Sequence, residues 1–198
     1  MIDVAFPRSD FIVYTITVIT CCDTTCHAYA GADTTICQGG FVTLHATGCT
    51  GTQQWYTLSP EGLVPFNTNP NIDVFPQVST CYVLICCYPG STCCCDTDTV
   101  CVNVLPAPQL IWNFNYPSLC NNASPIVLDT ANIFVLVNNV PVPVNAVPGT
   151  GVFSGIGVSG NIFTPPGTGT WTISYTFTDA NGCSGTVSNT ITYLAVLN

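Results

Sequence analysis

The stretch that decides the fold is residues 80–104, TCYVLICCYPGSTCCCDTDTVCVNV. Two runs rich in cysteine, threonine and valine flank residues 88–91 (YPGS), and proline followed by glycine favours a type II turn. The pattern therefore predicts a β-hairpin. Strand side chains alternate between two faces, which places Cys81, Val83, Ile85 and Cys87 on one side and Tyr82, Leu84 and Cys86 on the other.

The composition is poor in charge and excludes several kinds of partner. Only 6% of the 198 residues are charged, and Arg8 is the single basic residue against ten acidic ones. Nucleic acid is excluded as a partner because phosphate binding needs clusters of lysine and arginine. Anionic membranes are disfavoured for the same reason. Mean hydropathy is +0.46, but no apolar run approaches the roughly 18 residues of a membrane span.

A soluble chain with so few charges either covers itself with small polar residues or buries its surface against other subunits. Exposed apolar surface usually marks an interface, so the composition favours contacts between subunits.

Cysteine usage points to an oxidising exterior. The chain has 14 cysteines, twelve of them between Cys21 and Cys101, including adjacent pairs and a triplet. Such density is typical of disulfide-bonded proteins outside the cytosol, so we expect an extracellular protein at the cell surface.

Short alternating runs separated by glycine, proline and asparagine predict an all-β fold of two tandem sandwiches preceded by an N-terminal strand. We expect an N-terminal strand and cysteine-rich connector at 1–31, a cysteine-rich domain at 32–105, and a second domain at 106–198. Residues 106–108 (PAP) form the expected stiff linker.

Residues 11–20, FIVYTITVIT, are β-branched and interleaved with threonine, which favours a strand over a secretion signal cleaved near residues 28–30. Such a strand either pairs with its own sheet or completes the sheet of a neighbouring copy. In the second case the protein polymerises through this segment, with apolar contacts from Phe11, Val13, Ile16 and Val18.

Metal and cofactor chemistry has weak support. Cys22, Cys26 and His27 form C-x3-C-H, which is similar to haem-attachment and zinc motifs, although disulfides are favoured among so many cysteines. Asp96 and Asp98 share a strand face and could hold Ca²⁺, whereas solvent exposure is the simpler interpretation. We therefore expect no cofactor, with Ca²⁺ as the one alternative.

The run ICQGGFVTLHATGCTGTQQWYTL, followed by NIDVFPQVSTCYVLIC, resembles the immunoglobulin-like repeats of large bacterial surface adhesins. The resemblance covers about residues 34–104 and rests on Cys37, Val42, Thr43, Leu44, Gly48, Cys49, Trp55, Tyr82 and Cys86. It implies a Cys49–Cys86 bridge between two sheets with Trp55 packed on it. It also implies that Cys37 pairs with Cys93, Cys94 or Cys95, with Cys94 as the middle candidate.

The run GVFSGIGVSGNIFTPPGTGTWTISYTFTDANGCSG resembles a second adhesin repeat, with Trp171 in place of its usual tyrosine. The resemblance implies a β-sandwich, a Cys120–Cys183 bridge and export through the type IX system. The cysteines left over are candidates for interchain or extra disulfides: Cys21, Cys22, Cys26, Cys81, Cys87 and Cys101.

These patterns predict a structural subunit of an extracellular filament, fibre or sheath that polymerises with copies of itself. The alternative is a ligand-binding module of an adhesin that grips glycans or other surface proteins through exposed aromatic residues such as Tyr88 or Trp112. We expect no enzyme, because no nucleophile with a matching base and no glycine-rich phosphate loop is present.

Overall fold

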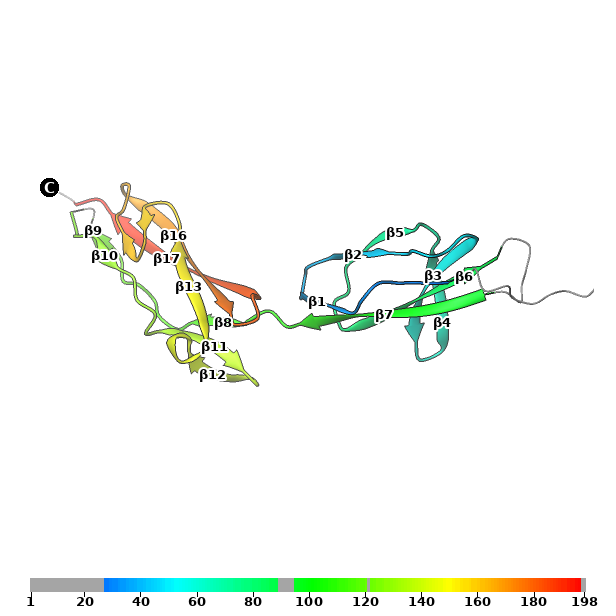
Figure 1. The fold of residues 1–198 in the computed structure, drawn as a ribbon. Helices are drawn as coiled ribbons and strands as arrows, with labels where there is room; N and C mark the ends of the chain where they lie inside the picture. Colours follow the sequence, from blue (N-terminus) through cyan, green and yellow to red (C-terminus); the bar gives the residue numbers. More distant parts are fainter. Residues whose placement is uncertain (1–26, 89–94, 121, 197–198) are drawn as a thin grey trace, which may run out of the picture.

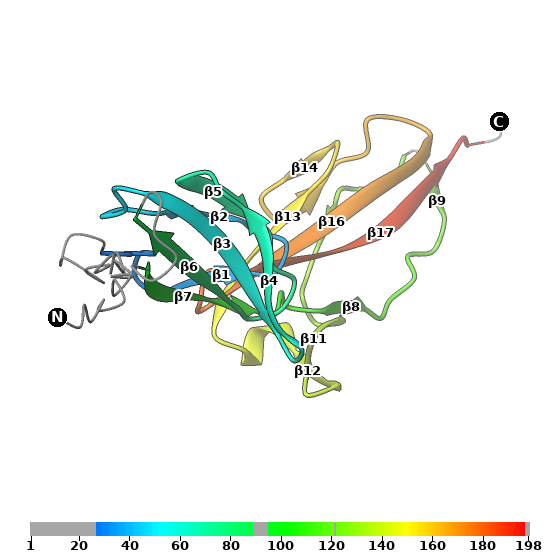
Figure 2. The same ribbon diagram turned by 90° about the vertical axis from the view of Figure 1, so that its right-hand side faces the viewer.

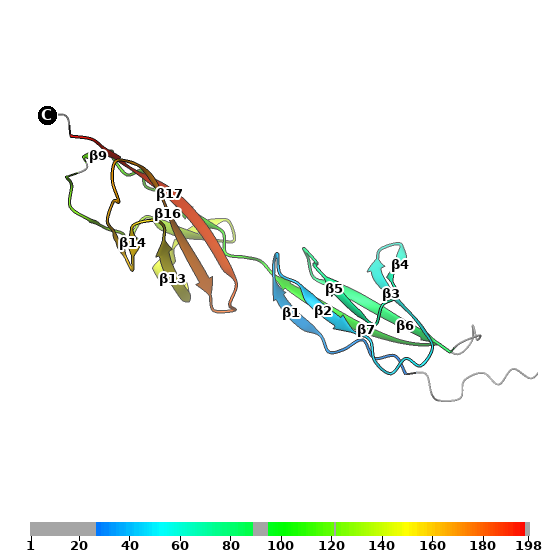
Figure 3. The ribbon, with the colours of Figure 1, turned by 90° about the horizontal axis from the view of Figure 1, so that it is seen from above.

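The computed structural model describes residues 27–88, 95–120 and 122–196. It confirms the all-β prediction: the chain forms two immunoglobulin-like β-sandwiches, which lie end to end and are joined by one stretch of backbone (Figures 1 and 3). The predicted strand at residues 11–20 lies outside the described residues. No helix within the described ranges has the length and apolar character that crossing a membrane requires.

The first domain packs a five-stranded sheet against a two-stranded one. The larger sheet has the order β1-β7-β6-β3-β4, and the smaller one pairs β2 with β5. The strands are β1 (Thr34–Cys37), β2 (Val42–His45), β3 (Thr52–Ser59), β4 (Gly62–Asn67), β5 (Asn71–Val74), β6 (Thr80–Cys87) and β7 (Cys95–Leu105).

The β6–β7 hairpin is the centre of this domain, and its side chains alternate as the sequence predicted. Tyr82, Leu84 and Cys86 face the core, whereas Cys81 and Cys87 lie on the other face. The core gathers residues of both sheets around the fully buried Trp55, whose indole N–H donates to the Asn69 carbonyl at 3.0 Å. Of the predicted turn at residues 88–91, only Tyr88 belongs to the described residues.

Strand β1 runs parallel to β7, the only parallel neighbour in this sheet among the described strands. Thr34 pairs with Val102 and Cys37 with Leu105, so β1 covers only the last part of β7. Just before β1, Ala30 is 1% exposed and belongs to the first core. The end of the predicted connector therefore packs on this domain, while the boundary at residue 32 stays a prediction.

The second domain contains three small sheets, with the orders β13-β16-β17-β9, β12-β11-β8 and β10-β15-β14. Figure 2 shows β13, β16 and β17 of the largest sheet side by side. The elements are β8 (Leu110–Trp112), β9 (Leu119–Cys120), β10 (Ile126–Val127), β11 (Ile133–Val137), β12 (Val140–Pro143), the 3-10 turn η1 (Val144–Ala146), β13 (Gly149–Ser154), β14 (Val158–Ser159), β15 (Ile162–Phe163), β16 (Gly169–Asp179) and β17 (Ser184–Leu194).

The β11–β12 hairpin follows local rules. Asn138 and Asn139 both have positive φ, 51° and 63°, as the two central residues of a type I′ turn require. Pro141 and Pro143 lack the N–H group that an inner strand needs, and β12 lies at the edge of its sheet.

The long strands β16 and β17 present two different faces. Ile173, Tyr175 and Phe177 point into two adjoining cores of the second domain. The opposite face carries hydroxyl groups that pair across the strands at 2.7 to 3.0 Å: Thr170 with Thr192, Ser174 with Ser188, Thr176 with Thr186, and Thr178 with Ser184. Exposed hydroxyls thus replace charges on this sheet.

Replacing Leu84 by alanine tests the first core. Leu84 is 0% exposed, so Leu84→Ala should lower the free energy of unfolding by about 2–5 kcal/mol through lost burial and a residual cavity. Leu58 on the adjacent strand is 58% exposed, and Leu58→Ala should change the free energy of unfolding by less than about 0.5 kcal/mol. Guanidinium unfolding of the unreduced protein measures both. Equal effects would contradict the assigned core.

Candidate functional site

The hairpin cysteines form bonds according to the face on which they lie. Cys86 points inward and bonds Cys49, with Cα atoms 5.6 Å apart, which is the pairing implied by the adhesin resemblance. The outward cysteines bond directly opposite partners on the neighbouring strand: Cys81–Cys101 and Cys87–Cys95.

These pairings correct part of the sequence interpretation. Cys81, Cys87 and Cys101 form extra disulfides inside the chain, so the interchain alternative was wrong for all three. Cys21, Cys22, Cys26, Cys93 and Cys94 lie outside the described residues. The four described disulfides indicate a secreted or extracellular protein.

The fourth disulfide joins the two domains. Cys37, the last residue of β1, bonds Cys183 in the turn between β16 and β17, with an S–S distance of 2.02 Å and Cα atoms 5.4 Å apart. The bond lies beside the linker, because Gln38 donates its N–H to the carbonyl of Leu105 at 2.8 Å. We call this bond the interdomain clamp.

The clamp shows that the predicted pairing of Cys37 with Cys93, Cys94 or Cys95 was wrong. The parallel register places Cys37 beside Leu105, at the end of β7. Cys95 begins the same strand, and ten steps of about 3.3 Å put the two ends about 33 Å apart. No disulfide spans that distance.

The predicted Cys120–Cys183 bridge was wrong for a similar reason. Strand β9 runs parallel to β17 and pairs Cys120 with Leu194, the last residue of β17. Cys183 immediately precedes the first residue of β17, eleven steps or about 36 Å from Leu194 along the strand. Cys120 is exposed and is the free cysteine of the described chain.

Asp179 fixes the turn that presents Cys183. Its Oδ1 accepts the N–H groups of Asn181 and Cys183, both at 2.9 Å, and Gly182 takes a positive φ of 85°. The Asp-Ala-Asn-Gly segment is therefore a turn that the side chain of Asp179 closes.

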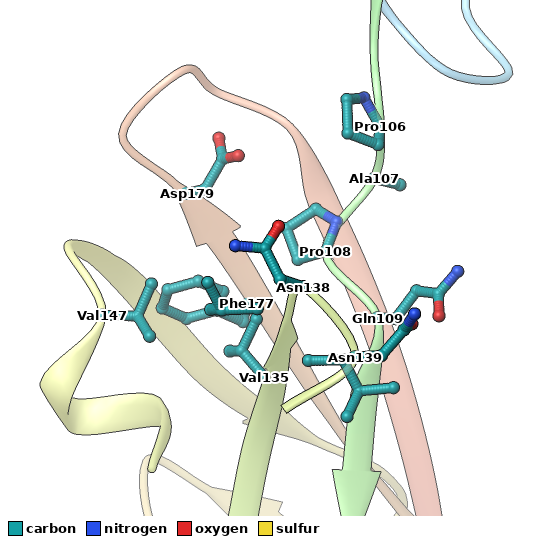
Figure 4. Close-up of a pocket in the computed structure, with 12 residues that line it drawn as sticks. Pro106, Ala107, Pro108, Gln109, Val135, Asn138, Asn139, Val147, Phe177 and Asp179 are labelled. Atoms are coloured by element: carbon teal, nitrogen blue, oxygen red, sulfur yellow. The ribbon is translucent and has the colours of Figure 1, made fainter. Parts of the chain in front are cut away.

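The linker packs directly on the second domain. The carbonyl oxygen of Pro108 lies where a Cβ on Gly185 would be, so only glycine fits at this point of β17. Beside it is an open cavity of about 440 Å³, lined by the linker, the β11–β12 hairpin, Val147, Phe177 and Asp179 (Figure 4). Together, the clamp and the linker contact fix one domain against the other.

Three carboxylates cover the part of β7 that β1 leaves unpaired. Asp96 and Asp98 accept the N–H groups of the next residue on β7, Thr97 and Thr99, each at 2.9 Å. Their second oxygens accept the N–H groups of Ala28 at 2.9 Å and Ala30 at 2.8 Å. Asp33 accepts the N–H of Cys101 at 2.8 Å. We call this arrangement the carboxylate edge.

The carboxylate edge explains Asp96 and Asp98 without a cation. Alternation along β7 indicated their shared face, but the sequence does not show that residues 28–30 lie beside them. Hydrogen bonds from Ala28 and Thr97, with His27 nearby, hold the pKa of Asp96 below its usual range. The Nδ1 of His27 is 4.0 Å from Oδ2 of Asp96. The described residues contain no cluster of metal-ligating side chains, and Ca²⁺ stays an untested alternative.

An aromatic pocket lies on the second domain. The rings of Phe114 and Tyr116 meet edge to face, with centroids 4.8 Å apart, and Trp112 adjoins Tyr116. With Asp129 and Asn132 these rings line a cavity of about 240 Å³. Burial and the neighbouring Asp129 raise the pKa of Tyr116, so its phenol keeps a proton to donate.

Comparison with known proteins identifies no family: no family model and no curated protein matches the sequence. Solved structures with a similar arrangement include the insect immune protein hemolin, at 10% identity over 85% of this chain and 46% of that chain, with a TM-score of 0.41. Sidekick-1 immunoglobulin domains 1–4 match at 11% identity over 84% of this chain and 48% of that chain, with a TM-score of 0.39. Fibronectin(III)-like modules of Clostridium thermocellum CbhA match at 13% identity over 83% of this chain and 90% of that chain, with a TM-score of 0.36. The chain spans about half the length of the first two. Such similarity carries no information about function.

Removing the interdomain clamp should loosen the arrangement of the domains. In the Cys37→Ser/Cys183→Ser variant we expect small-angle X-ray scattering to show a broader distribution of overall dimensions, because the linker alone then joins the two bodies. Cys81→Ser/Cys101→Ser removes a bond within one sheet and should leave the scattering unchanged. Unchanged scattering of the clamp variant would contradict this role.

Acid should weaken the hydrogen bond by which Asp96 holds the N–H group of Ala28. Because the folded-state pKa of Asp96 is lowered, its ionised form stabilises the fold above the ordinary value of about 3.9, and this contribution is lost as the pH falls through the lowered value. Asp96→Asn removes the charge and one acceptor oxygen. We expect faster hydrogen exchange of the Ala28 amide at neutral pH, with no change in Asp73→Asn. Equal exchange in both variants would argue against the carboxylate edge.

Proposed function

We propose that this protein is a structural subunit of an extracellular, disulfide-stabilised filament, fimbria or sheath on a bacterial surface, built by contacts between copies of the same chain. One observation carries the proposal. The described chain begins at the pole of the first domain that faces away from the second domain (Figure 1).

The position of this pole follows from hydrogen bonds. The N–H of Ala28 donates to Asp96, the second residue of β7, whereas the linker follows the last residue of the same strand. A strand-forming segment attached at the far pole of the first domain and an open sheet edge on the second domain make a heterologous contact. Contacts of this kind generate open filaments when they do not close into rings.

The interdomain clamp suits a load-bearing subunit. A flexible linker would let each repeat bend, whereas Cys37–Cys183 and the contact of Pro108 with Gly185 hold the two domains in one arrangement. A low content of charge also suits close packing of copies, because few charges must be desolvated at the interface. The resemblance to adhesin repeats supports the bacterial source, type IX export and a non-enzymatic role.

A second candidate function is a ligand-binding module of an adhesin, and the aromatic pocket favours it. Aromatic rings beside a carboxylate and an amide suit a ligand with an apolar face and hydroxyl groups, such as a sugar ring. A glycan-array screen of the unmodified chain tests this candidate, with Phe114→Ala as the variant that should lose any signal. Equal signals from both proteins would place glycan binding elsewhere.

Deleting residues 1–20 should abolish self-assembly, because the deletion removes the proposed linking strand and leaves both described cores intact. Sedimentation velocity of the unreduced protein should show single subunits for this variant and large assemblies for the parent chain. A matched deletion of residues 1–8 removes Arg8 but keeps the strand, and it should assemble like the parent. Assembly that persists without residues 1–20 would overturn strand donation.

A further inference from the structure

We propose that residues 11–20 of one copy add to the free edge of β13 in the next copy. The inference rests on the proposed function and names the surface that receives the strand. Strand β13 is the outer strand of the largest sheet in the second domain, and within the described chain it pairs with β16 alone.

The other edges of the described sheets are less suited to strand addition. An added strand needs several consecutive backbone donors and acceptors, and β4 and β13 are the two longest edges, with six residues each. Pro65 interrupts β4, and β12 carries Pro141 and Pro143; each proline removes a donor. The side of β7 that β1 leaves open is covered by the carboxylate edge.

The side chains of β13 leave its edge unobstructed. Gly149 and Gly151 face inward, where the rings of Phe177 and Tyr175 occupy the space of a side chain. The outward residues are small and uncharged, and Val152 is 62% exposed. The strand therefore has no proline or charge to repel an incoming strand.

Residues 11–20 match this edge in chemistry. They contain no charge and alternate between two faces, one with Ile12, Tyr14, Ile16 and Val18 and the other with Thr15 and Thr17 among apolar residues. Placed beside β13, the first face can cover the core side of the sheet. The threonines of the second face then extend the outer surface, where β16 and β17 already present paired hydroxyls.

Pairing of this segment with β13 of its own chain would require it to run back along the whole first domain. From Asp96 to Leu105, β7 extends about 30 Å at about 3.3 Å per residue, and the second domain lies beyond it. Residues 21–27 span at most about 25 Å when fully extended. Pairing within one chain would therefore use almost the full extended length of residues 11–27, and we take the β13 edge to be that of another copy.

The test uses Val152→Lys in the full-length chain. A lysine on an edge strand opposes strand addition, and the exposed position spares the fold. We expect loss of assemblies in sedimentation at concentrations where the parent assembles fully. Val64→Lys is the matched control, because Val64 is 48% exposed on β4 and its substitution should leave assembly unchanged.

A mixture gives the decisive readout. Val152→Lys retains a strand to donate, and the chain lacking residues 1–20 retains a free β13 edge. Neither should assemble alone, and together they should form a species of two chains that grows no further. Circular dichroism of each variant confirms its folding.

The outcomes separate the two proposals. If the deletion abolishes assembly but Val152→Lys assembles fully, β13 is not the acceptor, while strand donation stands. If Val64→Lys alone blocks assembly, β4 is the acceptor and this inference is wrong. Two-chain species in the mixture support the inference; their absence overturns it. Persistent assembly of the deletion variant overturns strand donation itself.

Discussion

The parallel pairing of β1 with β7 is the constraint on which the rest of the structure depends. It sends the chain from the far pole of the first domain to the linker, so that Cys37 arrives beside Leu105 and within reach of Cys183. The same direction leaves Ala28 at the opposite pole, where Asp96 holds it. An antiparallel β1 would exchange these positions, so that Cys37 could no longer reach Cys183 and Ala28 would no longer lie beside Asp96.

A surface almost without charge needs other means of staying ordered and solvated. The outer face of β16 and β17 uses serine and threonine hydroxyls that pair across strands and keep further hydrogen-bonding capacity for water. Six of the acidic side chains instead accept backbone or hydroxyl hydrogen bonds from elsewhere in the described chain: Asp33, Asp73, Asp96, Asp98, Asp129 and Asp179. Disulfides add covalent links where salt bridges would otherwise stabilise a secreted domain.

Local patterns predicted the strands. The disulfide pairings that they missed depend on the direction in which distant strands run beside each other. Alternation in residues 80–87 placed Cys86 inward and Cys81 and Cys87 outward. Pairing of Cys37 and of Cys120 depends on the direction in which β1 and β9 run beside their neighbours. Periodicity does not contain that information, because a strand alternates identically in both directions. The carboxylate edge was hidden for the same reason: it joins segments 68 residues apart.

Head-to-tail assembly of a clamped two-domain rod is the central claim, and negative-stain electron microscopy of the native, unreduced protein tests it most directly. The account predicts unbranched fibres whose axial repeat corresponds to one two-domain subunit. Dispersed particles the size of a single chain, at concentrations that favour association, would contradict it.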